Sequence, residues 1–367
     1  MSTGETPRSR EFQEQQKGKI NTSSEMEIKV HQINVLNDSF EQFQNCTPSD
    51  YLKQLKVHLI ESNEKLNESS PKEWINLVIN DLLKPQTNLF THSEHNAYFP
   101  SSKSSTSPES LKLFKFSGLI FALSIIYDAS PQISFASFFL KQILHIPITQ
   151  EDIKDYDPNI YDSFDYFKKH GFDKTELYFD TIINTSEGQK NVELIPNGEN
   201  TKVTDENKDQ YFNLMTDLLL SKSIKEQTNA FCEGFYSLVP LQEIQSITEE
   251  ELKHLIYGSS RIDIEILKKR ITIKPPYTAE TPVIKYFFNA ISHWNNQDLQ
   301  KLLMFVTGYT NITKDEEIFS INQAGRSGML PMAHTAIRSL ELPEYESEEE
   351  LNKNLMTCIN YTGLLIE

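Results

Sequence analysis

The segment LPMAHTAIRSLELPEY, residues 330–345, has the composition of an active-site turn except at its centre. His334 and Thr335 directly precede Ala336 in this proline-bounded stretch. An imidazole and a hydroxyl can donate or accept protons. The methyl group of Ala336 has neither a lone pair with which to attack a carbonyl nor a proton to lose. The segment therefore predicts a turn that presents a reactive side chain, with alanine in its place.

Other candidate reactive groups are weaker. His92 and His95 have the HxxH spacing of a partial metal site, but no further ligand follows at a suitable interval, so a solvated loop is favoured. Cys46, Cys232 and Cys358 are far apart and lack CxxC spacing, which favours neither a disulfide framework nor a zinc cluster. The last two cysteines fall in apolar patterns and are predicted core residues. We predict no metal and no cofactor, since neither a P-loop nor a Rossmann glycine pattern occurs.

Composition restricts the partners of this chain of 367 residues. Its formal net charge is −17 and no basic stripe is present, so we expect no binding to nucleic acid. The densest apolar run, residues 118–127, is half the roughly 20 residues that a membrane-spanning helix needs, so we expect no membrane insertion. A polar N-terminus without a secretory signal, together with three scattered cysteines, predicts a cytosolic or nuclear setting.

The elements that must position the turn are mainly helical. Residues 1–28 are polar and are predicted to be a disordered leader. The following patterns indicate a strand over 26–35, an amphipathic helix from Pro71 capped by Ser69 or Ser70, two buried helices within 109–143, a β-hairpin formed by 176–184 and 190–196, and a long helix capped by Thr204.

The C-terminal part is predicted to be a small α+β domain. Pro275, Pro276 and Pro282 interrupt regular structure after a helix that begins with the capping box of Thr248 and Glu251. A second capping box starts the last helix, which is predicted to bury one face. The capping box consists of Ser347 and Glu350. The predicted buried face of the helix consists of Leu351, Leu355, Cys358 and Ile359.

Five segments together resemble the HECT domain, the catalytic domain of one class of ubiquitin ligase. They are VTDENKDQYFNLM (203–215), QTNAFCEGFYSLVP (227–240), TEEELKHLIYGSSRIDIEILKK (248–269), LLMFVTG (302–308) and the segment 330–345. Their order and spacing agree with the family, and the similarity extends from about Lys29 to Glu367. The resemblance implies a bilobal α+β fold, mainly helical: an N-lobe over 29–278 with a hairpin-bearing subdomain, a hinge at 279–281, and a C-lobe over 282–367.

The resemblance also implies the reaction and its partners. In the family, ubiquitin passes from the cysteine of a conjugating enzyme to a C-lobe cysteine, and then to a lysine of a protein substrate. The C-lobe cysteine corresponds to Ala336, while His334 and Thr335 would shape the turn that presents it. Glu367 matches a terminal acidic residue that helps to position the acceptor lysine in part of the family. The residues that would bind the conjugating enzyme are Ile160, Phe164, Leu177 and Tyr211. Half-buried packing on a helix and hairpin is the alternative explanation of the same residues, and their apolar character favours the docking role.

Several positions depart from the family pattern. Ser69 and Ser70 stand where paired glycines are usual, and Asn311 stands where an arginine is usual. Leu364 replaces an aromatic residue near the chain end. These departures affect the positions expected for the tail and the thioester, and leave the expected fold unchanged.

Two hypotheses therefore remain open. In the first, the chain is an active HECT-type transferase in which cysteine 336 was changed to alanine, which the otherwise intact segment 330–345 favours. In the second, it is a natural pseudo-ligase that binds a conjugating enzyme or ubiquitin without transferring ubiquitin. The additional departures at other positions favour this second hypothesis.

Overall fold

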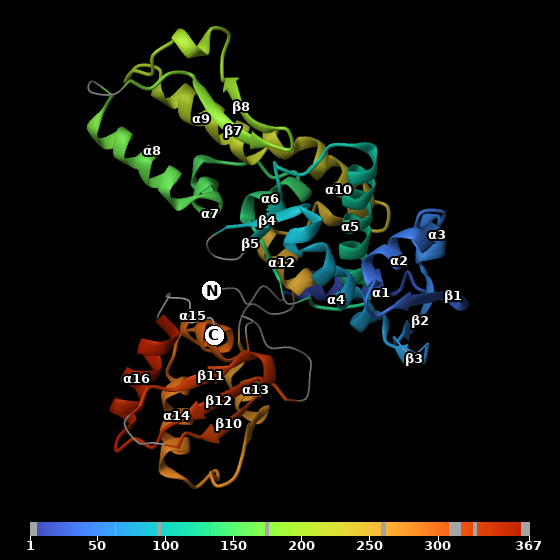
Figure 1. Ribbon diagram of the computed structural model, residues 1–367, viewed down its shortest axis with the longest axis vertical. Coiled ribbons are helices and arrows are strands. Elements are labelled where there is room, and N and C mark those ends of the chain that lie inside the picture. The colour runs from blue at the N-terminus through green and yellow to red at the C-terminus, as the bar shows by residue number, and fades with distance from the viewer. Residues whose placement is uncertain are drawn as a thin grey trace. The chain divides into compact units, whose positions relative to one another are not determined.

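The computed structural model describes residues 6–62, 64–93, 97–131, 133–172, 176–257, 262–307, 317–325 and 329–360. The chain forms two compact units, one of residues 6–256 and one that begins at residue 257 (Figure 1). The fold is α+β and mainly helical, as predicted. No helix in the described part of the chain is long and apolar enough to cross a membrane.

Two helices form the centre of the N-terminal unit. α5 (Pro108–Ile126) is buried over most of its length and crosses α10 (Lys225–Tyr236), beside which it lies in Figure 1. Phenylalanine rings fill the space around this pair: Phe121 lies 4.6 Å from Phe135, and Phe139 lies 5.1 Å from Phe231, between ring centroids. Such contacts stabilise a core beyond the area that they bury. The two helices predicted within 109–143 are α5 and α6 (Ser137–Ile143).

The helix predicted from Pro71 is present as α4 (Pro71–Leu82). Ser70 is its N-cap, and its hydroxyl accepts a hydrogen bond from the backbone N–H of Glu73 at 3.1 Å. Trp74 is fully buried and donates from its indole N–H to the Ser39 hydroxyl at 2.9 Å. Sequence patterning therefore located both the start and the buried face of this helix.

Two small sheets accompany these helices. β2 (Lys53–Ile60) lies between β1 (Asn21–His31), to which it is parallel, and β3 (Leu66–Ser69), to which it is antiparallel. β4 (Phe90–His92), β5 (Ala97–Pro100) and β6 (Ser134–Phe135) form the second sheet. The strand predicted over 26–35 is β1, which begins earlier and ends at His31. The remaining elements near them are α2 (Val35–Phe43), α3 (Pro48–Tyr51) and η1 (Pro85–Thr87).

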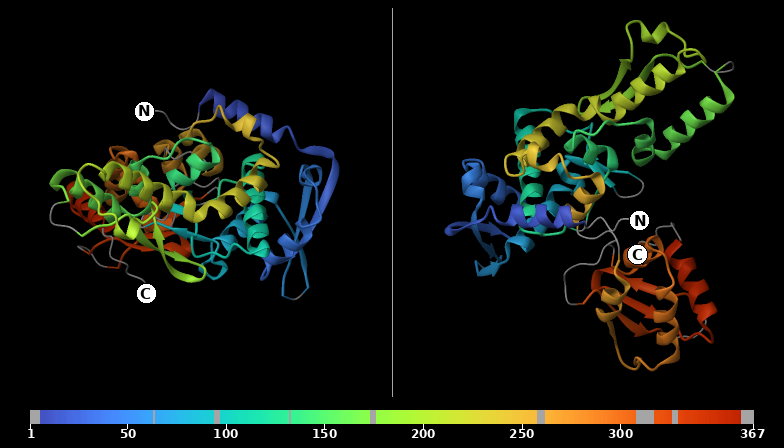
Figure 2. Two further views of the ribbon diagram at one scale, coloured as in Figure 1. Left: turned by 90° about the horizontal axis from the view of Figure 1, so that it is seen from above. Right: turned by 180° about the vertical axis from the view of Figure 1, so that it is seen from behind.

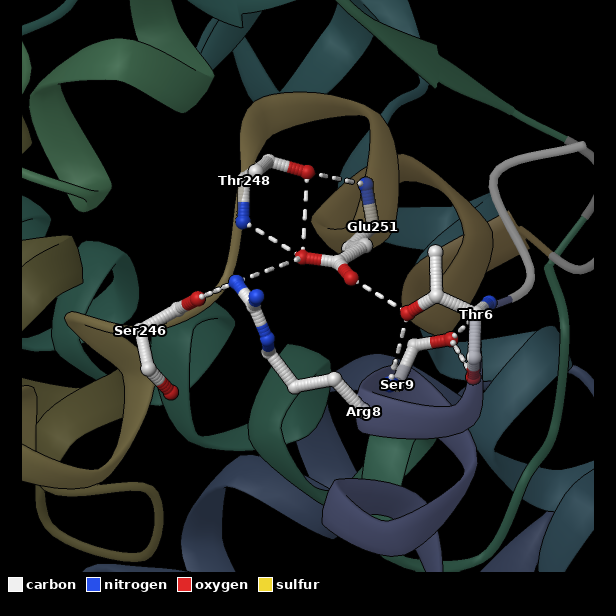
Figure 3. A network of polar contacts seen from close by, with 6 residues as sticks. All are labelled: Thr6, Arg8, Ser9, Ser246, Thr248 and Glu251. Carbon is white, nitrogen blue, oxygen red and sulfur yellow. Dashed lines mark hydrogen bonds and ion pairs between the residues drawn. The ribbon is translucent and has the colours of Figure 1, made fainter. Parts of the chain in front are cut away.

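The prediction of a disordered leader over 1–28 is wrong for the residues from 6 onward. They form α1 (Pro7–Lys17) and the first part of β1, and α1 packs against α5 (Figure 2). Polar contacts anchor its start (Figure 3): Thr6 donates from its hydroxyl to the Glu251 carboxylate, and Arg8 donates to the carbonyl of Ser246 at 2.8 Å. Composition alone could not reveal partners more than two hundred residues away.

Further along α1, one aromatic side chain and several polar groups are held by the same unit. Phe12 is buried, and Gln16 donates to the Glu243 carboxylate at 2.9 Å. Lys19, just after the helix, donates to the same carboxylate at 2.7 Å. Hydrogen bonds within the fold thus pair the Gln16 amide N–H and the Lys19 ammonium, two of the polar groups that suggested disorder.

A hairpin-bearing part completes the N-terminal unit. The predicted hairpin is β7 (Asp180–Thr185) and β8 (Gly188–Glu193), which lie beside α9 (Lys208–Leu220) in Figure 1. The predicted cap at Thr204 is wrong, because Asn207 occupies the N-cap position and its side chain accepts from the Thr204 N–H at 2.8 Å. The other elements are η2 (Gln150–Asp152), α7 (Ile153–Tyr156), α8 (Pro158–His170), η3 (Gly198–Asn200), η4 (Lys222–Ile224), α11 (Leu241–Ile244) and α12 (Glu249–Tyr257). The Thr248–Glu251 capping box starts α12 as predicted.

The C-terminal unit is a four-stranded sheet with helices packed on it. Its strands, in spatial order, are β11 (Met332–His334), β12 (Ser339–Leu342), β10 (Phe319–Gln323) and β9 (Ile271–Ile273). β10 is parallel to β9 and β12, while β11 is antiparallel to β12. The helices are α13 (Ile264–Lys269), α14 (Pro282–Ser292), α15 (Asn296–Thr307) and α16 (Glu348–Asn360), and η5 (Thr335–Ile337) follows β11.

The structure corrects the predicted boundary between the lobes. The N-lobe was expected to end at 278, with a hinge at 279–281, whereas the two units divide between Ile256 and Tyr257. Two contacts explain the difference: Ile271 in β9 pairs with Phe319 in β10, and the Tyr277 hydroxyl donates to the carbonyl of Leu342 at 2.9 Å. The proline-rich stretch thus lies inside the C-terminal unit.

Candidate functional site

Position 336 lies in a tight turn between two antiparallel strands. β11 ends at His334, the 3₁₀ turn η5 spans 335–337, and β12 begins at Ser339. Arg338 closes the turn in a left-handed conformation, with φ 48°, and its N–H donates to the carbonyl of Thr335 at 3.2 Å. The three residues predicted for the site, His334, Thr335 and Ala336, are therefore consecutive in one turn.

The turn is fixed to the sheet by backbone and side-chain hydrogen bonds. The N–H of Ser320 in β10 donates to the carbonyl of Arg338 at 3.0 Å. The amide of Asn322, also in β10, donates to the Ser339 hydroxyl at 2.6 Å. Leu340 and Leu342 in β12 are fully buried. A turn held in this way is a suitable platform for a reacting group, because its backbone is positioned by rigid elements.

His334 contacts Glu341 across the two strands. Its Nε2 lies 3.2 Å from Oε1 of Glu341, and the two side chains are 43% and 38% exposed. The pairing of β11 with β12 aligns His334 with Ser339 and Met332 with Glu341, so the pair is diagonal on one face of the sheet. Sequence reasoning missed Glu341. The alternation of side chains in an antiparallel hairpin is the signal that could have identified it.

Several large apolar side chains near position 336 in the sequence are exposed. Four large ones lie within a few residues of position 336, with exposed fractions between 47% and 72%: Met329, Leu330, Met332 and Ile337. Exposed apolar side chains that form one contiguous patch are typical of surfaces that contact another protein.

Burial disfavours the ionised, nucleophilic form of all three cysteines. Burial raises the pKa of the Cys232 thiol to about 11, and burial also raises the pKa of Cys358. Burial and the nearby Asp50 carboxylate raise the pKa of Cys46. A raised pKa lowers the fraction of each thiol that is ionised at neutral pH, and the thiolate is the nucleophile. Cys358, predicted to be buried, is only half-buried on α16, with its sulfur 3.5 Å from the carbonyl oxygen of Pro331.

The predicted docking residues lie on α8, α9 and the segment before β7. Phe164 and Tyr211 are each only 5% exposed, with ring centroids 6.5 Å apart, and Phe212 lies 4.5 Å from Phe164. Burial, with the Asp180 carboxylate nearby, raises the pKa of Tyr211 to about 12. These two aromatic residues are thus core residues of the hairpin-bearing part.

Two of the predicted docking residues remain accessible. Ile160 lies one turn before Phe164 on α8 and is half-buried, as is Leu177. A direct contact with a partner would therefore involve Ile160 and Leu177, with Phe164 supporting α8 from beneath.

Of the remaining positions that the sequence singled out, some lie outside the residues that the structure describes. His95, Asn311, Leu364 and Glu367 lie outside the described residues. Ser69 donates to the Glu73 carboxylate at 2.7 Å, so both Ser69 and Ser70 have partners at the start of α4. His92 ends β4. Within the described ranges, no three His, Cys, Asp or Glu side chains are grouped to hold a metal ion.

The known proteins that this chain resembles are ubiquitin ligases. A family model described as HECT-domain (ubiquitin-transferase) matches residues 76–364. The chain is 28% identical to E3 ubiquitin-protein ligase HACE1 of Danio rerio over 345 residues, covering 90% of this chain and 38% of that protein. It is 31% identical to E3 ubiquitin-protein ligase pub1 of Schizosaccharomyces pombe over 348 residues, covering 91% and 45%. With E3 ubiquitin-protein ligase UPL1 of Arabidopsis thaliana the identity is 30% over 361 residues, covering 92% and 10%. The chain thus spans less than half the length of these relatives.

Proposed function

The chain belongs to the HECT-domain (ubiquitin-transferase) family, and we propose that position 336 is where its C-terminal unit receives ubiquitin from a conjugating enzyme. The observation that carries this proposal is the turn itself. It places position 336 two residues after His334, whose ring contacts Glu341, on a backbone that is fixed to β10. The exposed apolar side chains around the turn would contact the ubiquitin that is transferred.

The reaction exchanges one acyl bond for another. A thiol at position 336 attacks the carbonyl carbon of the ubiquitin C-terminus, a new C–S bond forms, and the C–S bond to the conjugating enzyme breaks. The thiol proton leaves with the conjugating enzyme's sulfur. The amine of a substrate lysine then attacks the new thioester, which forms the isopeptide bond and regenerates the thiol.

We propose further that the chain with Ala336 cannot complete this reaction. A methyl group cannot form a thioester, and burial disfavours the ionised form of the three thiols that the chain does carry. The turn nevertheless retains the left-handed Arg338 and the His334–Glu341 pair. These features favour the hypothesis of a transferase in which the nucleophile alone was replaced. Its expected setting is cytosolic or nuclear.

Binding of the conjugating enzyme is proposed for the hairpin-bearing part. Ile160 and Leu177 supply half-buried apolar area there, which is typical of residues that become buried on association. This function does not need a thiol at position 336. A chain with Ala336 would therefore still bind its conjugating enzyme.

The second candidate is a natural pseudo-ligase, a non-catalytic module that binds the conjugating enzyme or ubiquitin. Besides Ala336, the observation that favours it is the integration of Ser69 and Ser70 into the start of α4, where the family usually has glycines. The codon for position 336 in the source gene separates the two candidates. A cysteine codon there eliminates the pseudo-ligase.

The proposed function is tested with Ala336→Cys and a panel of ubiquitin-charged conjugating enzymes. We expect an adduct of this protein with ubiquitin that forms within the first turnover and is cleaved by thiol reductant. If no conjugating enzyme in the panel yields a reducible adduct, the proposed transferase function is wrong.

A further inference from the structure

We propose that a cavity in the N-terminal unit binds an arginine side chain of a partner protein. The cavity has a volume of about 890 Å³ and lies between α9, α10 and the segment 145–150 that follows α6. These helices are labelled in Figure 1. The volume falls within the range of about 300 to 1,000 Å³ that is usual for ligand sites. The inference does not rest on the proposed function, because the cavity contains neither position 336 nor the docking residues Ile160 and Leu177.

The first argument is a buried hydroxyl group that lacks a partner. Thr228 on α10 lines the cavity and is only 5% exposed. Within the described part of the chain, its Oγ1 has no hydrogen-bond partner. Buried polar groups are normally hydrogen-bonded, because removing them from water without a new partner is unfavourable. A polar ligand in the cavity would supply this partner.

Two further hydroxyl groups of the cavity are left as hydrogen-bond acceptors. Thr216 on α9 is buried, and its hydroxyl donates to the carbonyl of Phe212 at 2.7 Å. Tyr236 on α10 donates to the carbonyl of Ile143 at 2.6 Å, and burial together with the neighbouring Cys232 raises the pKa of Tyr236, so the proton stays on its oxygen. A hydroxyl that has donated its proton can only accept further hydrogen bonds. A ligand that complements these oxygens must therefore bring donors.

The acidic and basic residues at the cavity are of one sign. Asp217 and Glu233 line it, and no lysine or arginine is among the described residues that do so. Asp217 pairs with Lys222 at 2.8 Å, and Glu233 pairs with Lys115, but both lysines are more than half exposed. Exposed ion pairs of this kind are weak, so the two carboxylates can exchange their lysines for a ligand cation. The cavity is thus suited to a cation that carries several donors.

A guanidinium group meets these requirements better than an ammonium group. It has five N–H donors in one plane, is less strongly hydrated and stacks on aromatic rings. His145 and Tyr236 provide two rings whose centroids are 6.1 Å apart, and Ile146 and Ile148 provide apolar area for the methylene groups of an arginine. The cavity is larger than one arginine side chain, so flanking residues of a peptide fit beside it. This favours an arginine within a protein segment over the free amino acid.

The binding test titrates the chain with the peptide acetyl-Ala-Arg-Ala-amide and follows the threonine methyl groups by ¹H–¹³C NMR. We expect a saturable shift of the Thr228 methyl resonance, and no shift for Thr22, an exposed residue outside the cavity. The same peptide with citrulline in place of arginine keeps the shape and removes the charge. It should bind more weakly by roughly tenfold or more. Free argininamide should bind more weakly than the arginine peptide.

Substitutions measured by calorimetry locate the bound peptide. Thr228→Val removes the hydroxyl without a partner and keeps the shape of the side chain, so we expect about tenfold weaker binding and no decrease in Tm. Thr22→Val is the matched control and should leave binding unchanged. Asp217→Asn and Glu233→Gln should each weaken binding of the arginine peptide but not of the citrulline peptide. Glu187→Gln, at an exposed carboxylate outside the cavity, should have no effect.

Three results would each overturn the inference. They are a Thr228 resonance that does not shift, equal affinity for the arginine and citrulline peptides, and an affinity that Thr228→Val leaves unchanged. If argininamide binds as tightly as the arginine peptide, the assignment to a protein segment is wrong. All of these measurements use the chain with Ala336, so they are independent of whether Ala336→Cys forms an adduct.

Discussion

Gly118 on α5 and Gly234 on α10 mark the point where the two central helices of the N-terminal unit cross in backbone contact. A Cβ atom at Gly118 would lie 1.8 Å from the carbonyl oxygen of Phe231, and one at Gly234 would lie 1.7 Å from that of Lys115. Both distances are far below van der Waals contact, and each clash is with backbone. The crossing therefore requires glycine on both helices. This close contact explains why the segment AFCEGF, part of the family resemblance, has glycine at position 234.

Replacement of Gly234 by alanine should separate the two helices and disturb the phenylalanine core between them. We expect Gly234→Ala to lower the free energy of unfolding by about 3 kcal/mol or more, since overpacked backbone cannot relax by rotamer changes. Chemical denaturation of the whole chain measures this difference. Gly325→Ala is the control, because a Cβ at Gly325 meets no atom within 4 Å. Equal stability of the two variants would show that the helices do not cross as described.

The sequence predicted elements whose determinants are local. Ser70 caps α4, the Thr248–Glu251 box starts α12, and the hairpin forms where alternating segments flank a glycine-containing loop. These features depend on residues within a few positions of one another. Helix α1 and the boundary of the C-terminal unit were predicted incorrectly because they depend on distant contacts, such as Thr6 with Glu251 and Ile271 with Phe319.

The anchor of α1 can be removed with one substitution, which deletes the Thr6 hydroxyl and its γ-methyl group. Thr6→Ala deletes both the N-cap acceptor of α1 and the donor to Glu251. We expect the first turn of α1 to lose about 1 kcal/mol of local stability, the usual effect of removing a cap. Amide hydrogen exchange measured by mass spectrometry should show faster exchange in α1 and no change in α4. Exchange in α1 that is already unprotected in the wild-type chain would contradict the described anchoring.

Glu251 makes this anchoring dependent on pH. Burial by itself would raise the pKa of Glu251, but hydrogen bonds from Thr248 and Thr6 and the charge of Arg8 outweigh it, and the pKa lies below its ordinary value of 4.5. A carboxyl with a lowered pKa stabilises the fold above its unfolded-state pKa, and this contribution disappears as the pH falls through the folded-state pKa. The difference in Tm between wild type and Glu251→Gln should therefore be largest above pH 4.5 and shrink below it. A difference that grows on acidification would contradict the assignment.

Substitutions can distinguish the proposed contact of Ile160 with a conjugating enzyme from the packing role of the buried Phe164. We expect Ile160→Ser to weaken binding of a conjugating enzyme by about tenfold, as for a moderate interface residue, with little change in Tm. Phe164→Ala should instead lower the free energy of unfolding by about 3 to 5 kcal/mol, because it empties a buried aromatic site. Ile33→Ser, at a side chain that is 85% exposed and lies outside α8 and the hairpin, is the control. Calorimetric binding that is as strong for Ile160→Ser as for Ile33→Ser would remove Ile160 from the docking surface.

Only part of the candidate site could be predicted from the sequence, because one of its residues depends on the register of two strands. His334, Thr335 and Ala336 are adjacent in sequence, so their arrangement could be expected from the segment alone. Glu341 joins them only through the antiparallel register of β11 and β12, which a single sequence does not specify. Phe164 and Tyr211 have apolar side chains that suit either a surface groove or a core, and the structure places them in the core.

The central claim is that position 336 is where ubiquitin is attached as a thioester when that position carries a thiol. The most direct measurement is mass-spectrometric mapping of the adduct formed by Ala336→Cys, by Ala336→Ser and by the chain with Ala336, each treated with the same charged conjugating enzyme. We expect the ubiquitin C-terminus at position 336 in the first variant as a reducible thioester, at the same position in the second as an ester that resists reductant, and no thioester or ester adduct in the third. Attachment at Cys46, Cys232 or Cys358, or a reducible adduct on the chain with Ala336, would contradict the account.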